Sequence, residues 1–216
     1  MDPNEILRLP PCVLLLTGFP GVGKLTIAKI IAAGLASVIP SGFSSVRVID
    51  YQVLLLPVED IAPGRDVEHY KVRQRIRDVA FKSLKEASNP NLRIIMTRAV
   101  TFDLEYDAKQ FNEYAALAKG RGVPLFTVDI TCNEDVNIER LCSEERRQAF
   151  AWGCNKLVNE QTLLNMRKEH RLLDPKEVEG NRRGSTIVYK VVDTSDYTAE
   201  EAAAKIVRAC LQSSED

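Results

Sequence analysis

The sequence has 216 residues, of which 45% are hydrophobic and 27% are charged, and its formal net charge is −1. A chain of this length can form one α/β domain with a substantial core, and its near-neutral charge argues against nucleic-acid binding through bulk charge. No apolar run approaches the roughly 20 residues that span a bilayer. The acidic start and five scattered cysteines without a C-x-x-C pair favour a cytoplasmic protein with no membrane segment.

Strands and helices are expected to alternate along the chain. Apolar and β-branched runs predict strands at about 12–17, 46–50, 92–97, 124–131 and 186–192. Apolar residues at helical spacing predict helices that end near 36, cover about 66–88, 105–121, 134–142 and 160–173, and begin at Thr198. Prolines and glycine predict irregular chain at 51–65, residues 143–158 lack a clear period, and 174–184 form a polar loop. This alternation predicts a single three-layer α/β domain over 1–216, with about five parallel strands and helices on both faces.

A glycine-rich stretch follows the first predicted strand. Residues 18–26 read G-F-P-G-V-G-K-L-T, and strand, glycine-rich turn and helix are the context in which G-x-x-x-x-G-K binds phosphate. The glycines let backbone N–H groups face a phosphate closely, the helix start adds partial positive charge, and Lys24 adds a mobile full charge. The residues predicted to bind the nucleotide are Gly18, Pro20, Gly21, Val22, Gly23, Lys24, Leu25 and Thr26.

The position after Lys24 departs from the usual pattern. Ser or Thr commonly stands there and offers its hydroxyl to Mg²⁺, whereas this chain has Leu25 followed by Thr26. Because a leucine cannot ligate a metal, Mg²⁺ is expected to be held through water, the nucleotide or a carboxylate elsewhere. Thr26 and Asp50 are the weak candidates for that role.

Two polar residues follow other predicted strands at the same edge of the sheet. Asp50 ends the second strand and is predicted to accept the proton of a substrate hydroxyl, the alternative being an aspartate that caps a turn. Arg98 follows the third strand and is predicted to bind an anionic substrate or the transferring phosphoryl group, the alternative being a surface ion pair.

Two signatures of other nucleotide-binding classes are missing. The third strand does not end in Asp-Glu, which argues against a mechanical ATPase, and Asp129 in the fourth strand is a weak substitute. The guanine-reading N-K-x-D is also absent, because Asn155-Lys156 is followed by Leu157-Val158. A motor and a GTPase are therefore disfavoured.

The loop matches the adenylate-kinase-like pattern G-x-P-G-x-G-K-G-T at every fixed position except Leu25. With Asp50 after the second strand, the chain resembles P-loop kinases of the nucleotide-kinase-like superfamily. It is similar to the chloramphenicol phosphotransferase, zeta toxin and gluconate kinase branches, which use an acidic residue there as catalytic base. It also resembles AAA-labelled small P-loop proteins with an I-D-x-x-L-L-x-P segment, here residues 49–57. Tyr51-Gln52 replaces the Asn-His that often follows the aspartate in that group.

The resemblance implies further site residues. A lid is expected over about 143–160, and its Arg146 and Arg147 would close over the phosphates, the alternative being a solvated helix face. Lys156, Arg167 and Arg171 are weaker candidates. Residues 51–88 would form the acceptor-binding segment. The loop after the fifth strand, with Asp193 and Thr194, would flank the base of the nucleotide or cap the last helix.

The resulting prediction is a phosphotransferase that uses ATP and Mg²⁺ to phosphorylate a hydroxyl of a small molecule. The catalytic residues would be Lys24, Asp50, Arg146 and Arg147, and the partners would be a nucleoside triphosphate and a small-molecule acceptor. Two alternatives stay open. One is a nucleotide-binding regulatory module with little turnover, which Leu25 and the missing acidic dyad favour. The other is a kinase that acts on a nucleotide or a nucleic-acid end.

Overall fold

The computed structural model describes residues 9–38, 45–64, 66–99, 105–151, 156–172 and 186–212. Within them the strands are β1 (Val13–Thr17), β2 (Val46–Asp50), β3 (Arg93–Thr97), β4 (Leu125–Thr131) and β5 (Ile187–Asp193). The helices are α2 (Lys24–Val38), α3 (Tyr51–Ile61), α4 (Val67–Lys85), α5 (Glu105–Arg121), α6 (Glu134–Leu141), α7 (Glu144–Ala151), α8 (Glu160–Glu169) and α9 (Ala199–Leu211).

All five strands are parallel and pair in the order β2-β3-β1-β4-β5, which confirms the predicted fold class. The strand that precedes the glycine-rich loop is therefore the central one. Since every strand runs the same way, their carboxyl ends meet at one edge, and Asp50 at the end of β2 lies in register with Thr97 at the end of β3.

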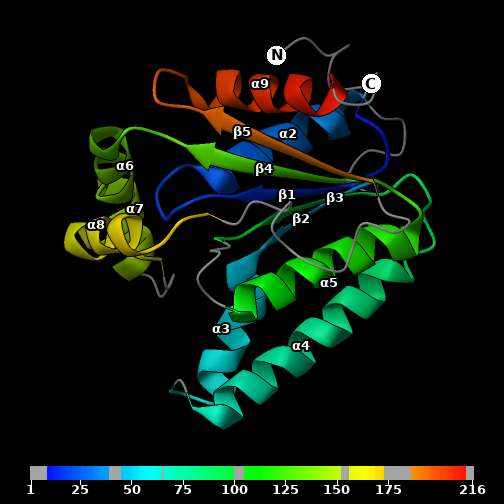
Figure 1. Ribbon diagram of the computed structural model, residues 1–216, viewed down its shortest axis with the longest axis horizontal. Coiled ribbons are helices and arrows are strands. Elements are labelled where there is room, and N and C mark those ends of the chain that lie inside the picture. Colours follow the sequence, from blue (N-terminus) through cyan, green and yellow to red (C-terminus); the bar gives the residue numbers. More distant parts are fainter. Residues whose placement is uncertain are drawn as a thin grey trace.

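Helices cover both faces of the sheet, with α2 and α9 on one side and α5 and α4 on the other (Figure 1). Alternate residues of β1 divide between the two cores. Leu14 and Leu16 pack toward α2 and α9, whereas Val13 and Leu15 pack toward α5, and all four are fully buried. This period of two in an all-apolar strand is what a sheet buried on both faces requires.

One predicted irregular segment is wrong: α3 begins directly after Asp50 and runs through Pro57. Proline removes one helical hydrogen bond, here the one to the carbonyl of Val53. Val53 is 62% exposed, so water can solvate that side of the helix. The packing of α3 on α4 outweighs the local preference against a helix, and the two helices extend together away from the sheet (Figure 1).

The segment without a clear period, 143–158, also contains a helix, α7, whose amino end carries Glu144 and Glu145. Four of its five side chains at 144–148 are exposed, so this part of the helix shows no apolar stripe that would predict it. Residues 152–155 and the loop predicted at 174–184 lie outside the described residues. None of the described helices combines the length and the apolar character that crossing a bilayer requires.

Candidate active site

The glycine-rich loop depends on backbone conformations that only glycine adopts easily. Gly18 and Gly21 have φ angles of 141° and 90°. A Cβ on Gly21 would lie 2.6 Å from Nδ2 of Asn137, and a Cβ on Gly18 would collide with the carbonyl oxygen of Ile130. The loop therefore takes its shape from close contact with β4 and α6, and the sequence motif is confirmed as a strand–loop–helix turn.

Lys24 is folded back over this loop. Its Nζ donates to the carbonyl oxygens of Gly18 at 2.6 Å and Phe19 at 2.8 Å. Burial, followed by the positive charge of Arg146, lowers the pKa of Lys24 to about 7. A phosphate is a better partner for this ammonium group than two neutral carbonyls, because a charged acceptor roughly doubles the strength of the bond.

Two residues outside the motif hold the loop from behind. Asn137 of α6 is fully buried, and its Nδ2 donates to the carbonyl of Pro20 at 2.8 Å. Arg167 of α8 donates to Oδ1 of Asn137 at 2.9 Å and lies 5.8 Å from the centre of the Phe19 ring. Sequence reasoning missed Asn137, because an asparagine in a polar helix carries no distinguishing pattern, and it ranked Arg167 only as a weak candidate.

Asp50 lies at the same edge as the loop. Its Oδ1 accepts a hydrogen bond from the hydroxyl of Thr97 at 2.7 Å, and its Oδ2 lies 3.6 Å from Nζ of Lys156. The hydroxyl fixes the orientation of the carboxylate, and the second oxygen is left facing a cation. Asp50 is thus positioned by β3 and by the segment that follows α7.

Two cavities meet at the loop. The first, the α9 cavity, measures about 430 Å³ and reaches Thr194 and Ala199. The second, the Asp50 cavity, measures about 570 Å³ and reaches Asp50 and Arg98. Both are lined by a shared set of residues: Gly21, Gly23, Thr26, Arg146 and Lys156. A phosphate chain along the loop would therefore have one chamber on each side.

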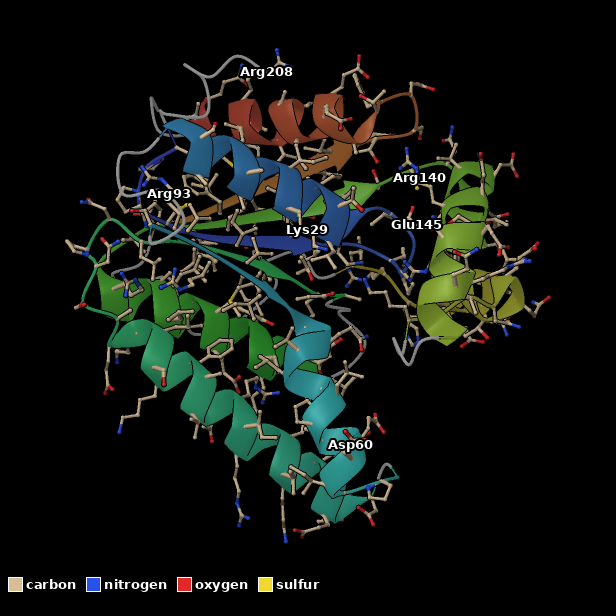
Figure 2. All side chains as sticks on the ribbon, turned by 180° about the vertical axis from the view of Figure 1, so that it is seen from behind. Lys29, Asp60, Arg93, Arg140, Glu145 and Arg208 are labelled. Atoms are coloured by element: carbon tan, nitrogen blue, oxygen red, sulfur yellow. The ribbon has the colours of Figure 1, made fainter. Side chains whose placement is uncertain are left out.

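The wall of the α9 cavity is fixed by Arg140 of α6. Its guanidinium donates to the hydroxyl of Thr194 at 3.1 Å and to the carbonyl of Thr194 at 2.9 Å. Arg140 and Glu145 lie where the α6–α7 side of the molecule faces the end of α9 (Figure 2). Thr194 lines the cavity, whereas the Asp193 carboxylate is exposed and accepts hydrogen bonds from the hydroxyl and the backbone N–H of Ser195, which lower its pKa.

The two lid arginines differ in position. Arg146 lines both cavities, and its Nε donates to the carbonyl of Leu157 at 2.8 Å. Arg147 is exposed and lines neither cavity. Lys156, which the sequence offered only as a weaker candidate, lines both cavities together with Arg146. One helical step separates the arginines, so only one of them can face the loop.

The described residues contain no group of three or more His, Cys, Asp or Glu side chains that could hold a metal ion. Leu25 lines the Asp50 cavity where a hydroxyl usually stands, and the exposed Thr26 lies at the shared wall. Asp129 is buried and accepts from the hydroxyls of Thr17 and Tyr189, so it serves the core. Thr26 and Asp50, the two candidates for a metal contact from the sequence, both line the Asp50 cavity.

No family model matches the sequence, and no curated protein does. Solved structures match over most of the chain. A candidate kinase from Chloroflexus aurantiacus has a TM-score of 0.55 at 18% identity, over 92% of this chain and 97% of that one. The tunicamycin resistance protein of Deinococcus radiodurans gives 0.53 at 17%, over 93% and 95%. APS kinase of Mycobacterium tuberculosis, in complex with AMPPNP and APS, gives 0.53 at 15%, over 93% and 98%. The chain therefore has the fold of P-loop kinases, as the sequence predicted.

Proposed function

We propose that this protein transfers the γ-phosphoryl group of ATP to a hydroxyl of a small molecule. The observation that carries the proposal is that Lys24 and Asp50 line one cavity, with the phosphate-binding loop between that cavity and a second one. A nucleoside in the α9 cavity would direct its phosphates along the loop toward Asp50. The similarity in fold to a structure solved with AMPPNP and APS supports this arrangement.

Each residue has a defined task in the proposed reaction. Backbone N–H groups of residues 21–26 and the ammonium group of Lys24 bind the phosphates. Asp50, oriented by Thr97, accepts the proton of the attacking hydroxyl. Arg146 and Lys156, which lie on the shared wall, face the charge that develops on the transferring group.

Mg²⁺ would enter with the nucleotide. Thr26 is the hydroxyl nearest to the usual position in the motif, and it lines both cavities. When bound, the metal would neutralise charge on the phosphate oxygens. In this proposal Asp50 acts as the base, with its two oxygens facing the Thr97 hydroxyl and Nζ of Lys156.

Replacement of Asp50 by asparagine tests the proposal. The amide cannot accept the hydroxyl proton, so transfer from [γ-³²P]ATP to an acceptor found by screening should fall by about 10²- to 10⁴-fold. Nucleotide binding, measured by calorimetry with AMPPNP and Mg²⁺, should stay within about twofold of wild type, since Asp50 does not line the α9 cavity. Asp60→Asn, at the far end of α3, is the matched control (Figure 2). Undiminished transfer by Asp50→Asn would contradict the assignment of the base.

A regulatory module that binds a nucleotide with little turnover is the second candidate. The observation in its favour is Leu25, which places an apolar side chain in the wall of the Asp50 cavity beside the phosphate-binding loop. Such a module would bind AMPPNP with the same dependence on Lys24 but would transfer phosphate to no acceptor. Product formation above the rate of Asp50→Asn would rule it out.

A further inference from the structure

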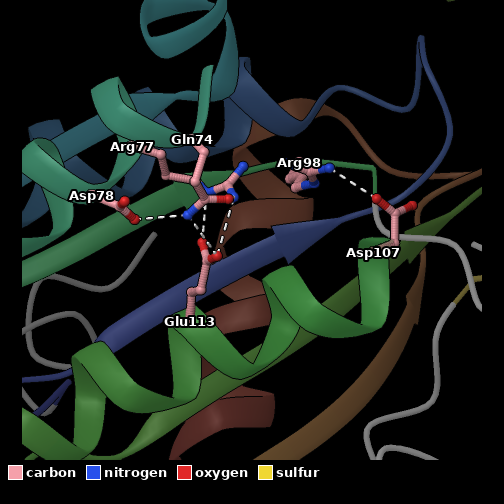
Figure 3. Close-up of polar contacts among 6 residues, drawn as sticks. All are labelled: Gln74, Arg77, Asp78, Arg98, Asp107 and Glu113. Atoms are coloured by element: carbon pink, nitrogen blue, oxygen red, sulfur yellow. Dashed lines mark hydrogen bonds and ion pairs between the residues drawn. The ribbon is translucent and has the colours of Figure 1, made fainter. Parts of the chain in front are cut away.

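The strongest unused feature of the Asp50 cavity is the guanidinium of Arg98. The residue is 5% exposed, and its Nη2 donates to Oδ1 of Asp107 at 2.9 Å (Figure 3). Its Nε and Nη1 have no hydrogen-bond partner within the part of the chain that the structure describes. A buried charged group with unused donors is costly, so it needs an explanation.

Arg77 of α4 shows what a satisfied guanidinium looks like in the same molecule. It is 2% exposed, its Nε and Nη2 bind both carboxylate oxygens of Glu113, at 2.5 and 3.1 Å, and Nη2 also donates to Gln74 (Figure 3). Arg77 lines neither cavity, whereas Arg98 lines the Asp50 cavity. The arginine with spare donors is therefore the one that a ligand can reach.

Tyr51 lies close to two positive charges in this cavity. Its ring centre lies 4.3 Å from the Arg98 guanidinium and 5.1 Å from that of Arg73. The Tyr51 hydroxyl is also buried and has no hydrogen-bond partner among the described residues. An aromatic face attracts both cations but gives them no hydrogen bonds, so an oxyanion would satisfy this group better than the ring does.

The charge of the cavity points the same way. Its wall holds five cationic side chains, those of Lys24, Arg73, Arg98, Arg146 and Lys156, against the two carboxylates of Asp50 and Asp107. The nucleotide phosphates account for Lys24, Arg146 and Lys156, which lie on or beside the loop. Arg98, whose Nε and Nη1 donors are unused, and Arg73 line the Asp50 cavity but not the α9 cavity, which places them on the side of the second substrate.

We infer that the acceptor is itself an anion, a hydroxy compound that carries a carboxylate or phosphate group, and that Arg98 and Arg73 beside Tyr51 bind this group. The inference rests on the proposed function and narrows its substrate class. The guanidinium suits an oxyanion because its Nε and Nη1 donors are unused and point in directions that the planar group fixes. Binding of the anion at Arg98 would place the rest of the acceptor between this residue and Asp50.

The test measures binding of inorganic phosphate to the full-length protein while AMPPNP and Mg²⁺ saturate the loop. Isothermal titration at constant ionic strength, adjusted with sodium chloride, should show one further phosphate site. Arg98→Lys keeps the positive charge beside Asp107 but removes the unused Nε and Nη1 donors, so it should weaken phosphate binding by about tenfold. Arg77→Lys is the matched control, a buried arginine paired with a carboxylate, and should leave the phosphate affinity unchanged.

Arg73→Gln, at a half-buried position of α4, is a second variant that keeps the test possible if Arg98→Lys fails to fold. It should also weaken phosphate binding. Acetate in place of phosphate separates the two acceptor classes, because a carboxylate site binds both anions and a phosphate site binds acetate poorly. Equal phosphate affinity in wild type, Arg98→Lys and Arg73→Gln, or no further site in wild type, would overturn the inference alone. Absence of AMPPNP binding would overturn the proposed function and this inference with it.

Discussion

The pKa of Lys24 gives nucleotide binding a measurable dependence on pH. Burial and the charge of Arg146 lower this pKa to about 7 in the free protein. A triphosphate brings negative charge to the same ammonium group, so binding must raise the pKa. Below pH 7 the lysine is charged before and after binding, and the affinity should be constant. Above pH 7 the free lysine is neutral and must take up a proton, so the affinity should fall.

The magnitude follows from the same value. One pH unit above the pKa of the free state, at pH 8, the dissociation constant should be about tenfold higher than at pH 6, equivalent to about 1.4 kcal/mol. Calorimetry with AMPPNP and Mg²⁺ in two buffers of different ionisation enthalpy should show uptake of about one proton at pH 8. At pH 6 the uptake should be close to zero.

Lys24→Arg is the control, because a guanidinium stays charged over this range and the titration of the ligand is common to both proteins. The variant should lose the tenfold change. Arg146→Gln removes the second cause of the lowered pKa of Lys24, so this pKa should rise. The affinity should then begin to decrease at a higher pH than in wild type. Identical pH profiles for wild type and Lys24→Arg would refute the reasoning.

Two further predictions concern the frame of the site. Gly21→Ala should weaken AMPPNP binding by about tenfold or more, because its methyl group would meet Asn137, which holds the loop. Gly122→Ala is the control, because Gly122 has a φ of 67° and no atom lies within 4 Å of the added carbon. It should cost about 1 kcal/mol of stability and leave the affinity for AMPPNP unchanged. An equal loss of affinity in Gly21→Ala and Gly122→Ala would point to backbone strain alone. Asp129→Asn should lower the free energy of unfolding by about 1–3 kcal/mol in urea titrations, because it disturbs two hydrogen bonds of a buried carboxylate. Its nucleotide affinity should match wild type, and a large loss would contradict a purely structural role.

The sequence predicted the elements that have strong periodic signals. The strand at 46–50 and the helix at 105–121 have the bounds that were expected, and the other strands differ by about one residue. The sequence did not predict two of the helices, α3 and α7. In α3 the proline masks a helix that packing on α4 stabilises, and α7 is too exposed to show an apolar stripe. Local pattern cannot report a stability that comes from tertiary contact.

The residues of the candidate site also fall into those that local spacing predicts and those that depend on tertiary contacts. The common position of the glycine-rich loop and Asp50 follows from spacing, since a strand end and a glycine motif both mark the same edge of the sheet. Asn137 acts through a contact with Pro20, 117 residues away in the chain, and no spacing predicts such a contact. The choice of Arg146 over Arg147 also depended on the helix that was not foreseen, because the helix decides which side chain faces the loop.

The shared wall between the two cavities has a consequence for ligand design. Both chambers are bordered by Gly21, Gly23, Thr26, Arg146 and Lys156, so the two cavities meet along the glycine-rich loop. A single molecule with a nucleoside at one end, an oligophosphate bridge and an oxyanion at the other could occupy both chambers at once. Tethering makes the second binding event intramolecular, and effective concentrations in the millimolar range can raise avidity by about 10²- to 10⁴-fold over either half. The bridge length that gives the tightest binding would then measure the distance along the loop between the two cavities.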